Sequence, residues 1–310
     1  MLAQKQFFMY NVVMKKIFVF IISALLLTAF TAQNPCSAKS LFGNKIAQSK
    51  YNKSEIENIK KVILQQEVYA NAHNLEDIQK LYSDDFVNSD GFNKEAYVKL
   101  IEETWKTYPD ITYKTNIRNI EFTDNYGTVF ADETASATTK EEIGEFDVFG
   151  EIYSATKCVY HLEKRNTSWI ITSERVIEEK TSLKYGEARF LDMSLDVPKQ
   201  IGSNKQYTAT LKVDVPEGTN IVGSISREKI VYPQTKSEDA FRNMYDNVLE
   251  RIFTSNTDNV NEYAVASVGI AHTSGYNENN IRVYLSGMAF IMSRVNVVPE
   301  NKFINLRGQE

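Results

Sequence analysis

Near residue 110 the pattern of apolar residues changes from helical spacing to alternation, and this change organises the first half of the chain. Before it, apolar residues recur three and four positions apart, which predicts helices that each bury one face. Ser54, with Glu57 three residues later, is typical of a helix start, Asn93 is placed to cap the third helix, and Pro109 ends it. The predicted helices cover residues 54–70, 75–82 and 94–108.

After Pro109, apolar and polar residues alternate, which predicts strands separated by turns such as Asp124–Gly127 and Lys164–Asn166. Helices followed by antiparallel strands form an α+β domain, which we place at residues 54–185. A short connection, residues 180–186, is expected to end this domain. The predicted strands are residues 111–123, 128–138, 146–163 and 168–178.

The second half shows short alternating runs that end at Pro198, Pro216 and Pro233. Such spacing predicts an immunoglobulin-like β-sandwich at residues 186–300. Apolar residues at helical spacing between residues 237 and 253 predict a helix inserted into this domain. The polar stretch 274–280 is expected to form a loop between the last two strands.

The amino terminus reads as an export signal. Lys15 and Lys16 precede an apolar run, residues 17–32, and small residues follow it. We therefore predict a secretory signal over residues 1–38, with translation starting at Met14, and an exported protein, periplasmic or extracellular. The run is shorter than the roughly 20 residues that span a bilayer, and an uncleaved membrane anchor is the alternative.

Composition narrows the chemistry of the protein. The chain has 310 residues, a formal charge of −5, two cysteines and three histidines. An acidic chain gives no reason to expect nucleic acid as a partner. So few histidines and cysteines make a metal site unexpected, and the sequence holds neither a phosphate-binding glycine loop nor a serine-hydrolase motif. We expect no metal and no cofactor.

The helix break Asn71–Asn74, the following stretch Leu75–Val87 and the strand Ser168–Ile171 after a hairpin resemble the nuclear transport factor 2-like (NTF2-like) superfamily. The SnoaL-like and ketosteroid-isomerase-like members are the nearest comparison. The resemblance covers roughly 130 residues, a common domain size. It implies a cone of three helices on a bent antiparallel sheet. It leaves function open, because the superfamily includes isomerases, cyclases, dehydratases, ligand carriers and dimerisation modules.

The resemblance to ketosteroid isomerases places a catalytic carboxylate on Asp90. Their tyrosine donor falls on Gln66, which lacks the weakly acidic hydroxyl, and their proline falls on Gly91. Asp90–Gly91 also reads as a simple turn before a helix, and we favour this interpretation.

The cavity of this fold would lie between the helices and the concave sheet face. Trp105 would form an aromatic wall, and polar groups would be few, as small-ligand sites require. An equally strong alternative is that these aromatic residues only fill the core. Glu133 in particular is expected to be exposed, because glutamate is rarely buried. The candidate polar lining residues are Tyr69, Tyr113, Glu133, Tyr160 and Glu174.

Cys158 and His161 are too far apart along one strand to act as a thiol–imidazole pair. Alternation sends residues three apart to opposite faces of a sheet. A buried, unreactive Cys158 is therefore the favoured interpretation.

These features predict an exported bacterial accessory protein whose first domain binds a small apolar or amphipathic ligand or mediates assembly. A cell-envelope protein and a second copy of the chain are possible partners. The first alternative is an isomerase- or lyase-like enzyme that uses Asp90 as a proton shuttle. The second is a structural dimerisation module with a filled core and no ligand.

Overall fold

The computed structural model describes residues 45–143, 146–216, 219–232, 241–244, 247–277 and 280–299. The chain divides into two compact units. The first contains residues up to Ala137 and Ser154–Ile177, and the second contains Thr138–Tyr153 and the chain from Glu178 onward. Within the described ranges no helix combines the length and apolarity needed to cross a membrane. The predicted signal, residues 1–38, lies outside them.

The first unit contains the helices that the sequence predicts, with a longer first helix. Asn93 caps α4 by accepting a hydrogen bond from the Ala96 N–H at 3.0 Å, and Asn74 caps α3 in the same way. The helix start predicted at Ser54 is wrong, because α2 passes through it. No glycine or proline between residues 45 and 54 interrupts the helix. The helical elements are α2 (Lys45–Asn71), α3 (Leu75–Ile78), the 3-10 turn η1 (Gln79–Leu81) and α4 (Lys94–Thr107).

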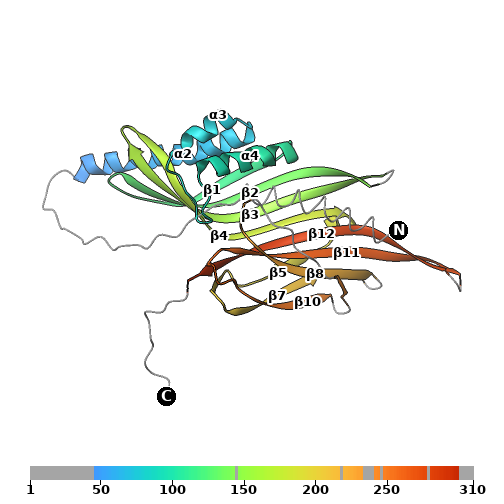
Figure 1. Cartoon of the computed structure of the whole chain (residues 1–310). Coiled ribbons are helices and arrows are strands. Elements are labelled where there is room, and N and C mark those ends of the chain that lie inside the picture. Colours follow the sequence, from blue (N-terminus) through green and yellow to red (C-terminus); the bar gives the residue numbers. More distant parts are fainter. Residues whose placement is uncertain are drawn as a thin grey trace, which may run out of the picture. The chain divides into compact units, whose positions relative to one another are not determined.

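These helices lie on one face of an antiparallel sheet with the strand order β1-β2-β3-β4 (Figure 1). The turns of the β1–β2 and β3–β4 hairpins contain residues with left-handed backbone, Asp124 (φ 54°) and Asn166 (φ 58°), where aspartate and asparagine are tolerated. Ile59, Ile63 and Leu100 from the helices and Tyr160 from the sheet are fully buried. The strands are β1 (Thr112–Thr123), β2 (Tyr126–Ile143), β3 (Phe146–Arg165) and β4 (Ser168–Gly186).

The second unit is built from strands. The Lys180–Gly186 part of β4 pairs with β12, and the order continues through β11, β8 and β9, while β6 pairs parallel to β12. A second sheet has the order β10-β7-β5. One apolar cluster, including Leu211, Ile225 and Val268, forms the core of this unit. Its further strands are β5 (Met193–Asp196), β6 (Gln200–Gly202), β7 (Gln206–Val213), β8 (Asn220–Lys229), β9 (Arg242–Asn243), β10 (Val248–Thr254), β11 (Glu262–Asn277) and β12 (Asn280–Val298), with the 3-10 turn η2 at Glu187–Phe190.

The helix predicted over residues 237–253 is wrong where the structure describes that segment. Residues 248–254 form β10, which pairs residue by residue with β7, and Arg242–Asn243 form β9. The rest of the predicted helix, residues 237–240, 245 and 246, lies outside the described residues. Pairing with β7 supplies backbone hydrogen bonds and a shared core, and these tertiary contacts override the helical spacing. The immunoglobulin-like form of this unit stays a prediction.

The predicted connection at residues 180–186 is also wrong, because it is the second half of β4. Thr181, Leu183 and Tyr185 are buried and alternate with less buried neighbours. This is the period of a strand with one face in a core. The compact units accordingly change at Ile177/Glu178, earlier than the predicted boundary, and the second unit also takes in residues 138–153.

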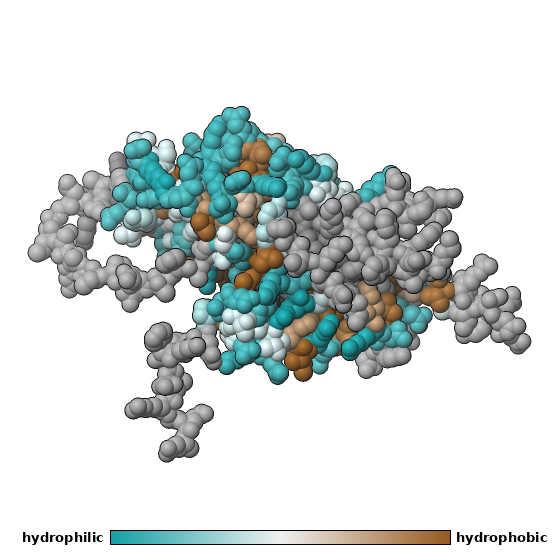
Figure 2. All heavy atoms as spheres, viewed as in Figure 1, coloured by the Kyte–Doolittle hydropathy of each residue, from teal (hydrophilic) through white to brown (hydrophobic). Residues whose placement is uncertain are grey.

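Large apolar side chains are also exposed on both units. Val68 and Tyr126 in the first unit and Phe149, Phe190 and Ile252 in the second are each at least half exposed. The visible face in Figure 2 shows hydrophobic side chains in several separate places among hydrophilic ones. Scattered apolar residues of this kind are normal on a soluble surface.

Candidate functional site

A cavity of about 60 Å³ lies inside the first unit, between its helices and its sheet. That volume holds a few water molecules or a small organic group. The residues that line it come from all three α-helices and all four strands of the unit, so the fold as a whole shapes it. They are Gln66, Glu67, Ala70, Ile78, Tyr82, Tyr97, Ile101, Trp105, Tyr113, Lys114, Thr115, Glu133, Thr134, Ala135, Ser154, Thr156 and Glu174.

Glu133 on β2 places a carboxylate against this cavity. The Tyr160 hydroxyl donates a hydrogen bond to its Oε1 at 2.6 Å, and the Thr115 hydroxyl lies at 3.5 Å. Burial raises the pKa of the Glu133 carboxyl; the two hydrogen bonds oppose this, and the negative charge of Glu67 adds to it. The expectation that Glu133 is exposed is wrong: its side chain is partly buried, and the hydroxyl of Tyr160 holds it in place.

Gln66 on α2 extends this contact into a chain of hydrogen bonds. Its Nε2 donates to the Tyr160 hydroxyl at 3.2 Å, and that hydroxyl in turn donates to Glu133. The Gln66 Oε1 is buried and has no hydrogen-bond partner in the described part of the chain. An amide therefore occupies the position that the resemblance gives to a tyrosine, and it presents an unused acceptor at the cavity.

Glu174 on β4 is a second buried carboxylate at the cavity. Its Oε2 accepts a hydrogen bond from the Tyr97 hydroxyl at 3.1 Å, and the hydroxyls of Tyr97 and Tyr82 lie 3.1 Å apart. Burial raises the pKa of both tyrosines well above the ordinary value, and the charge of Glu174 raises them further. Both hydroxyls therefore stay neutral across the physiological pH range and remain hydrogen-bond donors.

Aromatic rings form one wall of the cavity. Trp105 on α4 is almost fully buried, and the imidazole of His73 stacks on it with 4.9 Å between ring centroids. Tyr113 on β1 also lines the cavity, and burial raises the pKa of its hydroxyl above the ordinary value. His73 has left-handed backbone (φ 51°) in the turn that ends α2, and this turn brings its ring over Trp105.

The structure brings most of the predicted site residues together. Trp105, Tyr113, Glu133 and Glu174 line the cavity. Tyr160 does not line it, but contacts it through the hydrogen bond to Glu133. Tyr69 is partly buried and is not among the lining residues.

Asp90 is not among the lining residues and lies in a turn. The Asn88 side chain organises this turn: its Oδ1 accepts hydrogen bonds from the backbone N–H groups of Asp90 at 3.1 Å and Phe92 at 2.7 Å. Gly91 has φ of 84°, a value that glycine adopts without strain. This geometry supports the turn interpretation of Asp90–Gly91.

Sequence reasoning missed the tyrosine pair at the cavity. Tyr82 and Tyr97 lie on the apolar faces of their helical segments, where they read as ordinary core residues. Their hydroxyls meet Glu174 because β4 approaches these helices in the fold. The sequence did carry a signal for this pair, because both core positions hold tyrosine and not phenylalanine. A buried tyrosine hydroxyl needs a hydrogen-bond partner.

Cys158 and His161 do not form a site. Cys158 is buried, its thiol donates to the backbone oxygen of Ala131, and burial raises its pKa. His161 lies 3.4 Å from the Thr128 hydroxyl on the other side of the strand. Within the described ranges no group of three or more histidine, cysteine, aspartate or glutamate side chains is arranged to hold a metal ion.

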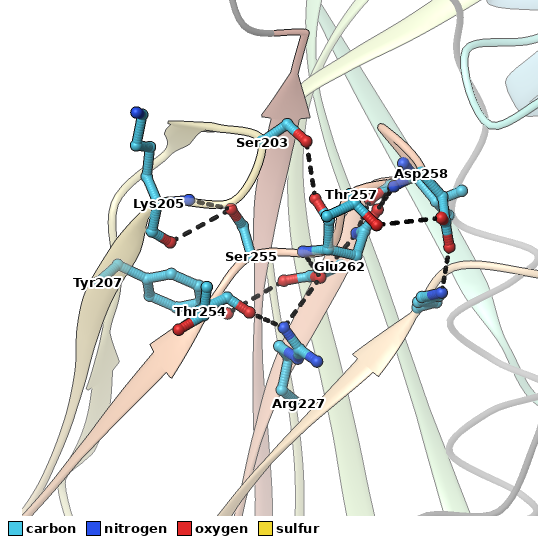
Figure 3. Close-up of polar contacts among 12 residues, drawn as sticks. Ser203, Lys205, Tyr207, Arg227, Thr254, Ser255, Thr257, Asp258 and Glu262 are labelled. Atoms are coloured by element: carbon cyan, nitrogen blue, oxygen red, sulfur yellow. Dashed lines mark hydrogen bonds and ion pairs between the residues drawn. The ribbon is translucent and has the colours of Figure 1, made fainter.

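The second unit also buries a carboxylate, and its surroundings are different. Glu262 at the start of β11 is fully buried, and its Oε1 accepts from the backbone N–H and the side-chain amide of Asn256 at 2.8 and 2.7 Å (Figure 3). Tyr207 donates to its other oxygen, and Arg227 lies 3.5 Å from the first. These contacts tie the segment after β10 to β7 and β8, and they have the character of a structural network.

No protein-family model matches the sequence, and no curated protein matches it. Solved structures that resemble part of the chain include a candidate scytalone dehydratase from Novosphingobium aromaticivorans (16% identity, 41% of this chain and 86% of the other, TM-score 0.33). Others are hexachlorocyclohexane dehydrochlorinase LinA-type3 from Novosphingobium barchaimii (14%, 41% and 88%, 0.34) and IdmH from Streptomyces antibioticus, a candidate polyketide cyclase (14%, 38% and 89%, 0.25).

These three structures have the NTF2-like fold. Helices over one face of an antiparallel sheet, as described in the first unit, are the architecture that the sequence resemblance implies. The geometry of the first unit therefore confirms the NTF2-like resemblance at the level of fold. Because the TM-scores are below 0.5, the similarity carries no conclusion about activity or ligand.

Proposed function

We propose that the first unit binds a small amphipathic molecule in its cavity, and that the protein does so as an exported accessory protein of the cell envelope. The observation that carries the first part is the chain Gln66–Tyr160–Glu133, which fixes a carboxylate and an unused amide acceptor beside the aromatic wall. Small-ligand sites combine an apolar lining with a few oriented polar groups in this way. The export part rests on residues 14–38 of the sequence.

Native mass spectrometry tests the binding proposal. We expect the full-length protein, purified from its own host, to carry an adduct of small mass that is lost on denaturation. Glu133→Gln should lose this adduct. The matched control is Glu121→Gln, an exposed glutamate on β1 in the same unit, which should retain it. A wild-type spectrum without any adduct at native protein concentration contradicts the proposal.

Export is tested separately by cell fractionation. Deleting residues 14–38 should move the protein from the envelope or medium into the cytoplasm. An unchanged distribution removes the export part of the proposal and leaves the binding part intact.

A second function is favoured by one specific observation. Glu133 lines the cavity, and burial raises the pKa of its carboxyl above the ordinary value, which makes the carboxylate a stronger proton acceptor. The enzyme alternative therefore shifts from Asp90 to Glu133. In a turnover screen of β,γ-unsaturated ketones, Glu133→Gln should abolish isomerisation and Asp90→Asn should leave it unchanged. Equal loss in both variants, or no turnover by the wild type, argues against this function.

The structural alternative, a dimerisation module with a filled core, expects no cavity beneath Trp105 and Tyr113. Both residues line the cavity described above, which supports the binding proposal over a filled core.

A further inference from the structure

The ionisable residues that line the cavity are mainly acidic. Glu67, Glu133 and Glu174 contribute carboxylates from three different elements, while Lys114 is the single basic residue in the lining and its side chain is exposed. Glu67 is held in place because its Oε2 accepts from the Thr115 backbone N–H at 2.6 Å. The cavity therefore presents a negative potential to anything that enters it.

The hydrogen-bonding groups of the cavity also favour a positively charged ligand. Gln66 Oε1 is a buried acceptor without a partner in the described residues, and the Glu133 carboxylate adjoins it through Tyr160. Acceptors of this kind need a ligand that brings donors. An ammonium group is such a ligand, since it carries three N–H donors and no acceptor.

The aromatic side chains that line the cavity are suited to a cation that also carries an apolar carbon chain. Tyr82, Tyr97, Trp105 and Tyr113 all line the cavity. A cation over the face of a tryptophan or tyrosine is attracted by the negative potential of the ring face, most strongly when the cation is desolvated. The same rings bury alkyl carbons.

We propose that the ligand of this cavity is a small organic cation, an amine whose ammonium group lies beside Glu133 and Gln66 and whose carbon chain packs on Trp105 and Tyr113. This inference rests on the proposed binding function and adds the chemical class of the ligand.

The proposal predicts how binding depends on pH. An amine pairs with ionised Glu133, so the affinity of the amine rises as the pH rises through the pKa of that carboxyl. A neutral ligand that accepts a hydrogen bond prefers the protonated carboxyl, so the affinity of such a ligand falls over the same range. Alkyl amines stay protonated throughout the range from pH 5 to 8, as lysine does, with a pKa of about 10. The other titratable or charged groups around Glu133 are Glu67, Glu174, Lys114, Asp132, Cys158 and the hydroxyls of Tyr82, Tyr97, Tyr113 and Tyr160.

Three probes with the same four-carbon chain test the charge directly: n-butylamine, n-butanol and butyrate. Each is titrated into the full-length protein while NMR follows the indole N–H of Trp105. We expect n-butylamine to bind at least tenfold more tightly than n-butanol, and butyrate to cause no saturable shift. Glu133→Gln should weaken n-butylamine about tenfold and leave n-butanol within twofold. Glu121→Gln, the exposed control on β1, should change neither.

The outcomes separate the two proposals. If n-butanol binds as tightly as n-butylamine, or if butyrate binds best, the cavity binds ligands but the cation assignment is overturned. If no probe of any charge binds, both proposals fail. A fall in n-butylamine affinity between pH 5 and pH 8 also overturns the cation assignment, even if the amine binds.

Discussion

Each unit of the chain places a glutamate among its strands, and the comparison between these residues separates a structural acid from the one that we propose binds a ligand. Glu262 in the second unit receives two hydrogen bonds from Asn256, one from Tyr207 and the charge of Arg227 (Figure 3). Glu133 in the first unit receives two hydrogen bonds at one oxygen, a short one from Tyr160 and a long one from Thr115, and adjoins a cavity. A buried carboxylate whose partners come from its own fold stabilises that fold. One that is only partly satisfied at a cavity is suited to a ligand.

The largest effect is expected where the buried acid is fully partnered. Glu262→Ala should lower the free energy of unfolding by about 3 kcal/mol, because it removes the acceptor of the Asn256 backbone N–H and of the Tyr207 hydroxyl, and the negative charge beside Arg227. Urea unfolding measures this loss. The control Glu250→Ala, an exposed residue of β10, should cost less than about 0.5 kcal/mol. Equal losses in both variants contradict the structural role of Glu262.

Glu55 supplies an intermediate case in the first unit. It is buried on α2, where Lys164 lies at 2.8 Å and the Trp169 indole donates at 2.7 Å. Glu55→Gln should lower the free energy of unfolding by about 1–2 kcal/mol, since it removes a charge-assisted contact. Glu57→Gln, on the exposed side of the same helix, should have little effect.

The pH dependence of this contribution has a definite sign. The hydrogen bond from Lys164 lowers the pKa of the Glu55 carboxyl below the ordinary value of 4.5. The carboxyl therefore stabilises the folded state above pH 4.5, and this contribution is lost as the pH falls through the lowered pKa. The difference in unfolding free energy between wild type and Glu55→Gln should shrink on acidification below pH 4.5. A difference that grows there contradicts the assignment.

A smaller effect is expected in the turn that holds Asp90. Gly91→Ala should cost about 1 kcal/mol of unfolding free energy, because φ of 84° is strained for alanine although its Cβ would meet no neighbour within 4 Å. Asp90→Asn should change stability by less than about 0.5 kcal/mol. Both variants should bind n-butylamine like the wild type. Loss of binding in Asp90→Asn restores Asp90 to the site.

The smallest effect on stability is expected at the cavity itself, in contrast to Glu262. Glu133→Gln should change the free energy of unfolding by less than about 0.5 kcal/mol near neutral pH, because the amide keeps an acceptor for Tyr160 and removes a charge that burial disfavours. Since burial raises the Glu133 pKa, the stability of wild type relative to this variant should fall as the pH rises above 4.5. Urea unfolding at pH 4 and pH 7 measures this; a rise of relative wild-type stability over that range contradicts it.

The local signals in the sequence were sufficient for most of the first unit. The cap at Asn93, the stop at Pro109 and the hairpin at Lys164–Asn166 each depend on a few neighbouring residues, so each could be predicted from them. The second half of β4 could not, because its partner β12 is distant in the sequence. The segment containing β10 has helical spacing and was decided by pairing with β7.

The residues of the candidate site likewise divide into those that local sequence signals predict and those that depend on distant contacts. Trp105, Tyr113 and Glu174 were predictable because strand alternation and helix faces point them inward once the fold is known. Glu133 was a candidate by its position on the strand, but its charge led us to expect exposure. The roles of Tyr82 and Tyr97 depend on a carboxylate from β4, a contact that joins residues 77 positions apart in the sequence. The prediction of Asp90 as a site residue rested on the spacing of a resemblance alone. In the structure Asp90 lies in the turn organised by Asn88 and is not among the residues that line the cavity.

The pairing of β4 with β12 has a consequence for the timing of folding. Gly186 pairs with Gly287, so about a hundred residues must be synthesised after β4 before its second half finds its partner. At roughly 5–20 residues per second, translation needs about 5–20 s for that length. During this interval the Lys180–Gly186 part of β4 lacks its partner strand, and the sheet of the second unit cannot be completed. A chain with this strand order therefore keeps its second unit open until β12 has been synthesised, and an open unit is the state in which a chaperone can bind it.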